Sequence, residues 1–132
     1  MKNLPAFALL GATLLLGTSS TRAEWHQFRG PNGNGYIAGN PKLPTELGQE
    51  TLAWKAPLPG RGLGSAIVVG NKVIVSAASG PHQDKLQILC FSNRDGSQLW
   101  RRSFWATGRT MCHKKTCVAA PTPTTDGKHI YV

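Results

Sequence analysis

The chain has 132 residues, and its 15 Lys and Arg side chains outnumber its 6 Asp and Glu, for a formal net charge of +9. A hydrophobic share of 40% is too high for a disordered chain, while 15 Gly and 9 Pro favour turns over long helices. No apolar span reaches the roughly 18 residues that a membrane helix needs, so we expect about one globular domain without a transmembrane span.

Residues 1–23 have the three parts of a secretory signal peptide. Lys2 precedes an apolar run, residues 4–16, which is too short to cross a bilayer of about 30 Å. Small residues end the segment at Ala23, as a signal peptidase requires. The alternative, a buried helix of the domain, lacks a flanking helix cap. Cleavage after Ala23 leaves 109 residues with 13 basic and 6 acidic side chains, a net charge of +7, and predicts export to the periplasm or the extracellular space.

Residues 24–50 are predicted to form an extended lead-in segment rich in Gly and Pro. They contain a turn cluster from Gly30 to Gly35 and no run with helical or strand periodicity. We expect Trp25 and Phe28 to anchor this segment on the fold that follows.

Short apolar runs alternate with turn residues from residue 51 onward. Gly70 and Asn71 tolerate the positive φ of a tight hairpin turn. The two runs beside them are almost continuously apolar, which predicts burial on both faces of a sheet. Residues 64–104 therefore predict an antiparallel meander of four strands, the size of a propeller blade. The expected strands of this meander are Ser65–Val69, Lys72–Ala77, Lys85–Phe91 and Gln98–Phe104, and a further short strand is expected before it at Leu52–Lys55.

Two motifs recur along the chain. Trp54 and Trp100 each follow a leucine by one or two positions and precede a basic residue. Residues 69–75 and residues 126–132 each place a turn glycine before a β-branched strand. Such an echo is typical of repeat proteins, in which each unit packs on the next.

These motifs resemble those of exported bacterial PQQ-like β-propeller repeat proteins, among them assembly factors of the BamB type. The resemblance covers almost all of residues 25–132 and implies an all-β fold of β-propeller blades, each a four-stranded antiparallel meander. It rests on Trp25–Gly33, Trp54–Lys55, Gly70–Val75 and Leu89–Trp100. Ser92 departs from the repeat, which usually has Asp at that position. The implied structural residues are two tryptophans and three turn glycines: Trp54, Trp100, Gly70, Gly96 and Gly127.

Residues 51–132 are too few for a complete propeller. At about 45 residues per blade they supply about two blades, whereas propellers have roughly 4 to 8. We therefore expect an incomplete ring from which further blades are missing. Isolated blades leave unpaired strand edges and an exposed face, so we expect the chain alone to aggregate or to be partly ordered.

Cys112 and Cys117 admit three interpretations. In an exported protein they favour a local disulfide that closes a loop. The alternatives are two free thiols and a metal site completed by His113 or His129, which lacks a C-x-x-C pair and an evident fourth ligand. Cys90 is expected to be a buried strand residue.

Gly60–Ser65 invites a nucleotide-binding interpretation because its glycines are closely spaced. The segment fails the last position of G-x-G-x-x-G and precedes a strand instead of opening a helix. We therefore expect a loop that leads into a strand.

Basic side chains cluster at Arg101 and Arg102, and again at Arg109, Lys114 and Lys115. Neighbouring strand residues point to opposite faces, so Arg101 and Arg102 do not form one nucleic-acid interface. The remaining interpretations are a solvated surface and attraction to an anionic envelope component or an acidic partner.

Two function hypotheses follow. The first is an exported, non-enzymatic β-propeller scaffold that binds other envelope proteins or an anionic envelope component and needs no cofactor. The alternative is a fragment of a PQQ-dependent quinoprotein dehydrogenase. The chain lacks the adjacent cysteines that such enzymes stack on the quinone, an acidic cluster for Ca²⁺, and any motif that combines a nucleophile with a base. These absences favour the scaffold over the enzyme. A third possibility is a non-functional fragment of a longer gene.

Overall fold

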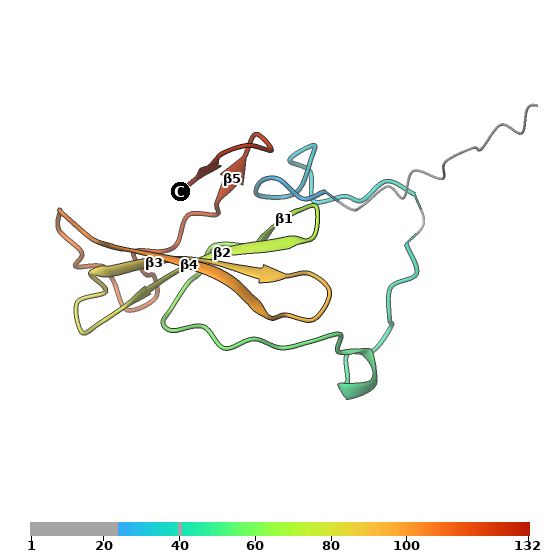
Figure 1. The fold of residues 1–132 in the computed structure, drawn as a ribbon, viewed down its shortest axis with the longest axis horizontal. Coiled ribbons are helices and arrows are strands. Elements are labelled where there is room, and N and C mark those ends of the chain that lie inside the picture. Colours follow the sequence, from blue (N-terminus) through green and yellow to red (C-terminus); the bar gives the residue numbers. More distant parts are fainter. Residues whose placement is uncertain (1–23, 40) are drawn as a thin grey trace, which may run out of the picture.

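The structure is a computed structural model that describes residues 24–39 and 41–132. These residues form a four-stranded and a two-stranded antiparallel sheet and one 3₁₀ turn, η1 (Figure 1). The expected all-β class is thereby confirmed, while the predicted signal peptide, residues 1–23, lies outside the described residues. In chain order the elements are η1 (Gln49–Thr51), β1 (Ile67–Val69), β2 (Lys72–Ser79), β3 (Lys85–Ser92), β4 (Gln98–Trp105), β5 (Thr124–Thr125) and β6 (Ile130–Tyr131).

The four-stranded sheet has the order β1-β2-β3-β4, so each strand pairs with its neighbour in sequence. In register, Ile74 of β2 lies between Ile67 of β1 and Cys90 of β3. Gly70, with φ of 57°, makes the tight turn between β1 and β2, where a side chain would be strained. The predicted four-stranded antiparallel meander is confirmed.

The expected strand at Leu52–Lys55 is wrong, because these residues belong to no strand of the described chain. The segment runs below the sheet in the view of Figure 1 and does not lie along its edge. In that position it covers the sheet with side chains but offers no backbone to a β-ladder. Trp54 and Ala56 are the side chains that it packs against the sheet.

One face of the sheet, here called the Leu89 face, is covered by the segment that precedes the sheet. Ala77, Leu89 and Phe91 are buried on this face, with 0%, 0% and 4% of their surface exposed. Trp54 packs against this cluster. The alternation of the strands places these residues together, because positions two apart point to the same side.

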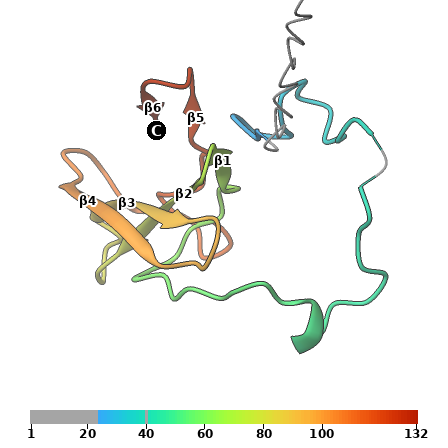
Figure 2. The same cartoon turned by 45° about the vertical axis from the view of Figure 1, so that its right-hand side comes forward.

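The opposite side, here called the Ile74 face, is covered by the hairpin that follows the sheet. Ile67, Ile74 and Cys90 are buried there, and Trp100 of β4 and Ile130 of β6 pack against them. Figures 1 and 2 show the β5–β6 hairpin and the segment before β1 on opposite sides of the sheet. The predicted burial of both faces is therefore confirmed.

The beginning of the lead-in segment closes the short edge of the sheet. Trp25 and Val68 exchange two backbone hydrogen bonds, both of 2.9 Å. The carboxylate of Glu24 accepts the amide of Gly70 at 3.1 and 3.2 Å and so holds the β1–β2 turn. Trp25 is an anchor as expected, but Phe28 is not, because 61% of its surface is exposed.

The same lead-in residues join the two sheets. The amide of Thr125 in β5 donates to the carbonyl of His26 at 3.0 Å, and the hydroxyl of Thr124 donates to the same oxygen at 3.1 Å. Because Trp25 pairs with β1 and His26 with β5, consecutive lead-in residues fix the hairpin beside the four-stranded sheet.

Gly60, Gly62 and Gly64 let the chain pass very close to other backbone. A Cβ on each would collide with a carbonyl oxygen, namely that of Ala78, Ser76 and Pro121, respectively. Arg61, between the first two glycines, exchanges backbone hydrogen bonds of 2.8 Å with Ala78. The alternate glycines are therefore a packing feature of a loop that leads to β1, as the sequence predicted.

Candidate functional site

Trp54 holds the turn between β3 and β4. Its Nε1 donates to the carbonyl of Asn93 at 3.1 Å, and its ring lies so close to Gly96 that a Cβ there would overlap it. Gly96 has φ of 71°, which also favours glycine. The side chain of Ser92 accepts the amide of Arg94 at 3.2 Å in the same turn.

Trp100 lies on the other side of the sheet from Trp54. It stands opposite Cys90 in the β3–β4 register and packs on the Ile74 face, whereas Trp54 packs on the Leu89 face. The two tryptophans that echo each other in the sequence therefore contact opposite faces of one sheet. Burial raises the pKa of the Cys90 thiol, although nearby Lys72 acts in the opposite direction.

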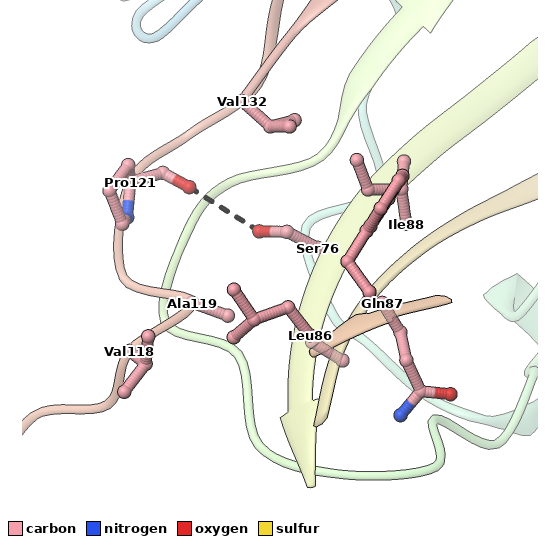
Figure 3. A pocket seen from close by; sticks show the side chains of 10 residues that line it. Ser76, Leu86, Gln87, Ile88, Val118, Ala119, Pro121 and Val132 are labelled. Carbon is pink, nitrogen blue, oxygen red and sulfur yellow. Dashed lines mark hydrogen bonds between the residues drawn. The ribbon is translucent and has the colours of Figure 1, made fainter. Parts of the chain in front are cut away.

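An open apolar groove of about 340 Å³ lies on the Ile74 side of the sheet. Leu86 and Ile88 of β3 form its floor with Phe104 of β4, and Val118 and Val132 come from the chain after the sheet. In Figure 3 the side chains of Leu86 and Val132 point into this space from opposite sides. Phe104 stays 52% exposed, so the groove is an uncovered part of the Ile74 face.

Polar groups beside the groove are satisfied within the fold. The Ser76 hydroxyl donates to the Pro121 carbonyl at 3.4 Å (Figure 3). The amide nitrogen of buried Gln87 donates to the Ser79 hydroxyl at 2.9 Å. With no unsatisfied polar side-chain atom buried among the described residues, the groove suits an apolar surface better than a polar small molecule.

The sequence motifs missed the groove because its lining comes from three separate parts of the chain. The alternation within β3 places Leu86 and Ile88 on one face, which was a usable signal. Nothing in the local pattern indicates that Val118 and Val132 return to that face, since this depends on tertiary packing.

Gly127 lies in the turn of the β5–β6 hairpin and has φ of 89°. In the same turn, Asp126 accepts the amides of Lys128 and His129 at 2.8 and 2.6 Å and the Tyr131 hydroxyl at 2.9 Å. These bonds hold the pKa of the Asp126 carboxyl far below its usual range, the backbone bond from His129 contributing most. The bond to this carboxylate in turn raises the pKa of Tyr131. The hydrogen bonds indicate a structural turn.

Cys112 and Cys117 are free thiols in this structure, so their pairing stays a prediction. The Gln83 side chain ties their loop to the β2–β3 turn: its Nε2 donates to Cys112 Sγ at 3.4 Å and its Oε1 accepts the amide of Val118 at 3.1 Å. Cys117 is buried in a small cluster with Ala78. Cys90 is buried in β3, as expected.

A second, more polar cavity of about 430 Å³ lies between the β2–β3 turn and residues 108–112. His82, Arg109 and Cys112 line it. No three His, Cys, Asp or Glu side chains come together as metal ligands in residues 24–39 and 41–132, and the carboxylates of Asp95 and Asp126 accept hydrogen bonds within their own turns.

The basic residues of β4 lie on opposite faces of the sheet, as the sequence indicated. Arg101 stands opposite Leu89 and Arg102 opposite Ile88, and both are exposed. Arg61 donates to the Lys114 carbonyl at 2.8 Å, so that part of the basic loop is fixed by a backbone contact.

Comparison with protein-family models, curated proteins and solved structures gives no match to this chain. No helix in the described part of the chain is both long enough and apolar enough to cross a membrane. The fold and its surfaces therefore supply the argument on function.

Proposed function

We propose that this protein is an exported, non-enzymatic β-propeller scaffold of the PQQ-like repeat type, which binds other envelope proteins or an anionic envelope component. In this proposal the four-stranded sheet is one blade, and the β5–β6 hairpin begins the next. The protein works by holding surfaces in place for partners, in the periplasm or outside the cell.

The observation that carries the proposal is the burial of the central strands β2 and β3 on both sheet faces by other parts of the chain. Trp54 packs on the Leu89 face, and Ile130 packs on the Ile74 face. A sheet at the surface of a domain has one apolar and one solvated face. A blade in a propeller has two packed faces, because it stands between two neighbouring blades.

The groove and the charge support a binding role. The groove leaves Phe104 and Val132 uncovered, and exposed apolar surface of this kind marks contact sites. The net charge of +7 that remains after cleavage at Ala23 favours acidic partners over basic ones.

Sedimentation velocity on the full chain tests whether the groove is a contact surface. We expect concentration-dependent association that Phe104→Glu suppresses, because a carboxylate on the groove floor must be desolvated in any packed complex. Trp105→Glu is the matched control, since Trp105 is the next residue of β4, is 69% exposed and lies outside the groove lining. Association that both variants reduce equally, or neither reduces, contradicts the role of the groove.

Reconstitution with PQQ and Ca²⁺ tests the alternative of a quinoprotein dehydrogenase fragment. The scaffold proposal predicts no dye-linked oxidation of alcohols or sugars by the reconstituted chain. Activity that depends on both additions would overturn it.

A further inference from the structure

The outer edge of β4 is the longest exposed strand edge of the described chain. β4 ends the strand order of the sheet and runs from Gln98 to Trp105, on the outer margin in Figure 2. All its residues except Trp100 are exposed. The opposite edge, at β1, is short and is already paired with Trp25. An edge of this length is a template for another strand.

The β3–β4 register shows which backbone groups face outward. The Ala106 amide donates to the carbonyl of Asp84, which stands directly opposite it in the register. Hydrogen-bonded and non-hydrogen-bonded pairs alternate in an antiparallel ladder. The N–H and C=O groups of Arg101, Ser103 and Trp105 therefore point away from β3, and no described residue bonds to them.

Charge disfavours a second copy of this chain as the partner of β4. In an antiparallel pair, outward-facing residues must stand opposite outward-facing residues. Two registers meet this condition and overlap most of β4. One places Arg101 opposite Arg101 of the second copy, and the other places Arg102 opposite Arg102. Like charges in directly opposite positions destabilise a strand pair. Neither arginine has an acidic partner among the described ion pairs.

We propose that the outer edge of β4 binds an extended segment of a partner protein that carries two adjacent acidic residues flanked by apolar ones. The added strand bonds to the outward groups of Arg101, Ser103 and Trp105. Because adjacent strand residues point to opposite faces, two neighbouring carboxylates reach Arg101 on one face and Arg102 on the other. Exposed Phe104 and Trp105, at 52% and 69%, supply apolar contacts beyond the arginines. This inference rests on the proposed binding function and names its partner chemistry.

Fluorescence anisotropy on the full chain tests the charge requirement. The probe is a labelled eight-residue peptide of Val and Thr with a central Asp-Glu pair, compared with the same peptide with a central Lys-Lys pair. We expect the acidic peptide alone to bind, and the double variant Arg101→Glu/Arg102→Glu to weaken it at least about tenfold. The double variant should in turn bind the Lys-Lys peptide.

A proline at position 103 tests whether binding uses the strand edge. Ser103→Pro removes an outward N–H while leaving the bonds to β3, since proline is tolerated on the free side of an edge strand. It should abolish peptide binding, whereas Ser103→Ala should bind normally. Comparable thermal melting of the two variants shows that the proline leaves the fold intact. In hydrogen exchange, the peptide should protect the amides of Arg101, Ser103 and Trp105.

Other outcomes separate this inference from the proposed function. The acidic peptide could bind but protect other amides, or bind Ser103→Pro as well as the unchanged chain. Either result overturns the role of the β4 edge but remains consistent with a binding scaffold. No binding of the acidic peptide overturns the inference. PQQ-dependent activity overturns the proposed function without reference to β4.

Discussion

The indole of Trp54 lies over Gly96, and its Nε1 donates to the carbonyl of Asn93, 3.1 Å away in the same turn. One side chain from the segment before the sheet thus covers the Leu89 face and clamps the β3–β4 turn. This contact joins parts of the chain 39 residues apart, so it belongs to the tertiary fold. The turn that presents β4 depends on it.

Replacing Gly96 by alanine should destabilise the protein by about 2 kcal/mol or more, through backbone strain at positive φ and overlap with Trp54. The measurement is urea unfolding followed by tryptophan fluorescence. Gly108→Ala is the matched control, because a Cβ at Gly108 meets no atom within 4 Å and its φ is not positive. Equal urea midpoints for the two variants would contradict the role of Trp54 in holding the β3–β4 turn.

Replacing Leu89 by alanine should cost about 2–5 kcal/mol, the usual cost of truncating a fully buried leucine. Leu99→Ala is the control, since Leu99 is 49% exposed on β4. Urea unfolding followed by tryptophan fluorescence is again the measurement. The free energies of unfolding of the two variants should differ by more than about 1 kcal/mol. A Leu89 variant as stable as the Leu99 variant would show that the Leu89 face is not packed in solution.

The four strands of the sheet could be predicted because their signals are local. Alternation in β3 assigned Leu86, Ile88 and Cys90 to one face, and the Gly70-Asn71 pair marked the hairpin turn. The same reasoning made a strand of Leu52–Lys55, because an extended apolar run looks alike whether it joins a sheet edge or crosses a sheet face. Only the tertiary contact of Trp54 with the β3–β4 turn decides between these positions.

The candidate surfaces needed the structure for the same reason. The sequence marked Arg101 and Arg102 as adjacent strand residues, but their place on the free edge follows from the strand order. The groove depends on Val118 and Val132 returning to the sheet after long loops. The spacing of Gly60, Gly62 and Gly64 carried a signal of close backbone approach that a motif search for nucleotide binding cannot recognise.

Under oxidising conditions, Cys112 and Cys117 should form a disulfide while Cys90 stays a thiol. Cys90 is fully buried and burial raises its pKa, so it has little reactive thiolate. Incubation of the native chain with oxidised glutathione, followed by alkylation and peptide mass spectrometry, measures this. After unfolding, we expect Cys90 to be the one cysteine that is alkylated. Cys112 and Cys117 should be recovered joined by a disulfide. Recovery of alkylated Cys112 and Cys117 after oxidation would contradict the pairing.

The turn of the β5–β6 hairpin should respond to acid in a way set by Asp126. Its carboxyl has a lowered pKa in the folded chain because it accepts bonds from His129, Lys128 and Tyr131. The stabilisation is therefore fully present above the unfolded pKa of about 3.9 and is lost as the pH falls towards the lower folded value. The amide shift of His129, followed by NMR, should titrate with a midpoint clearly below pH 3.9, and Asp126→Asn should abolish that titration.

In the same hairpin, Tyr131 should ionise above its ordinary pKa of about 10, since its hydroxyl donates to the Asp126 carboxylate. A His129 midpoint at the ordinary aspartate pKa, or a Tyr131 pKa unchanged in Asp126→Asn, would show that the turn does not hold these bonds in solution.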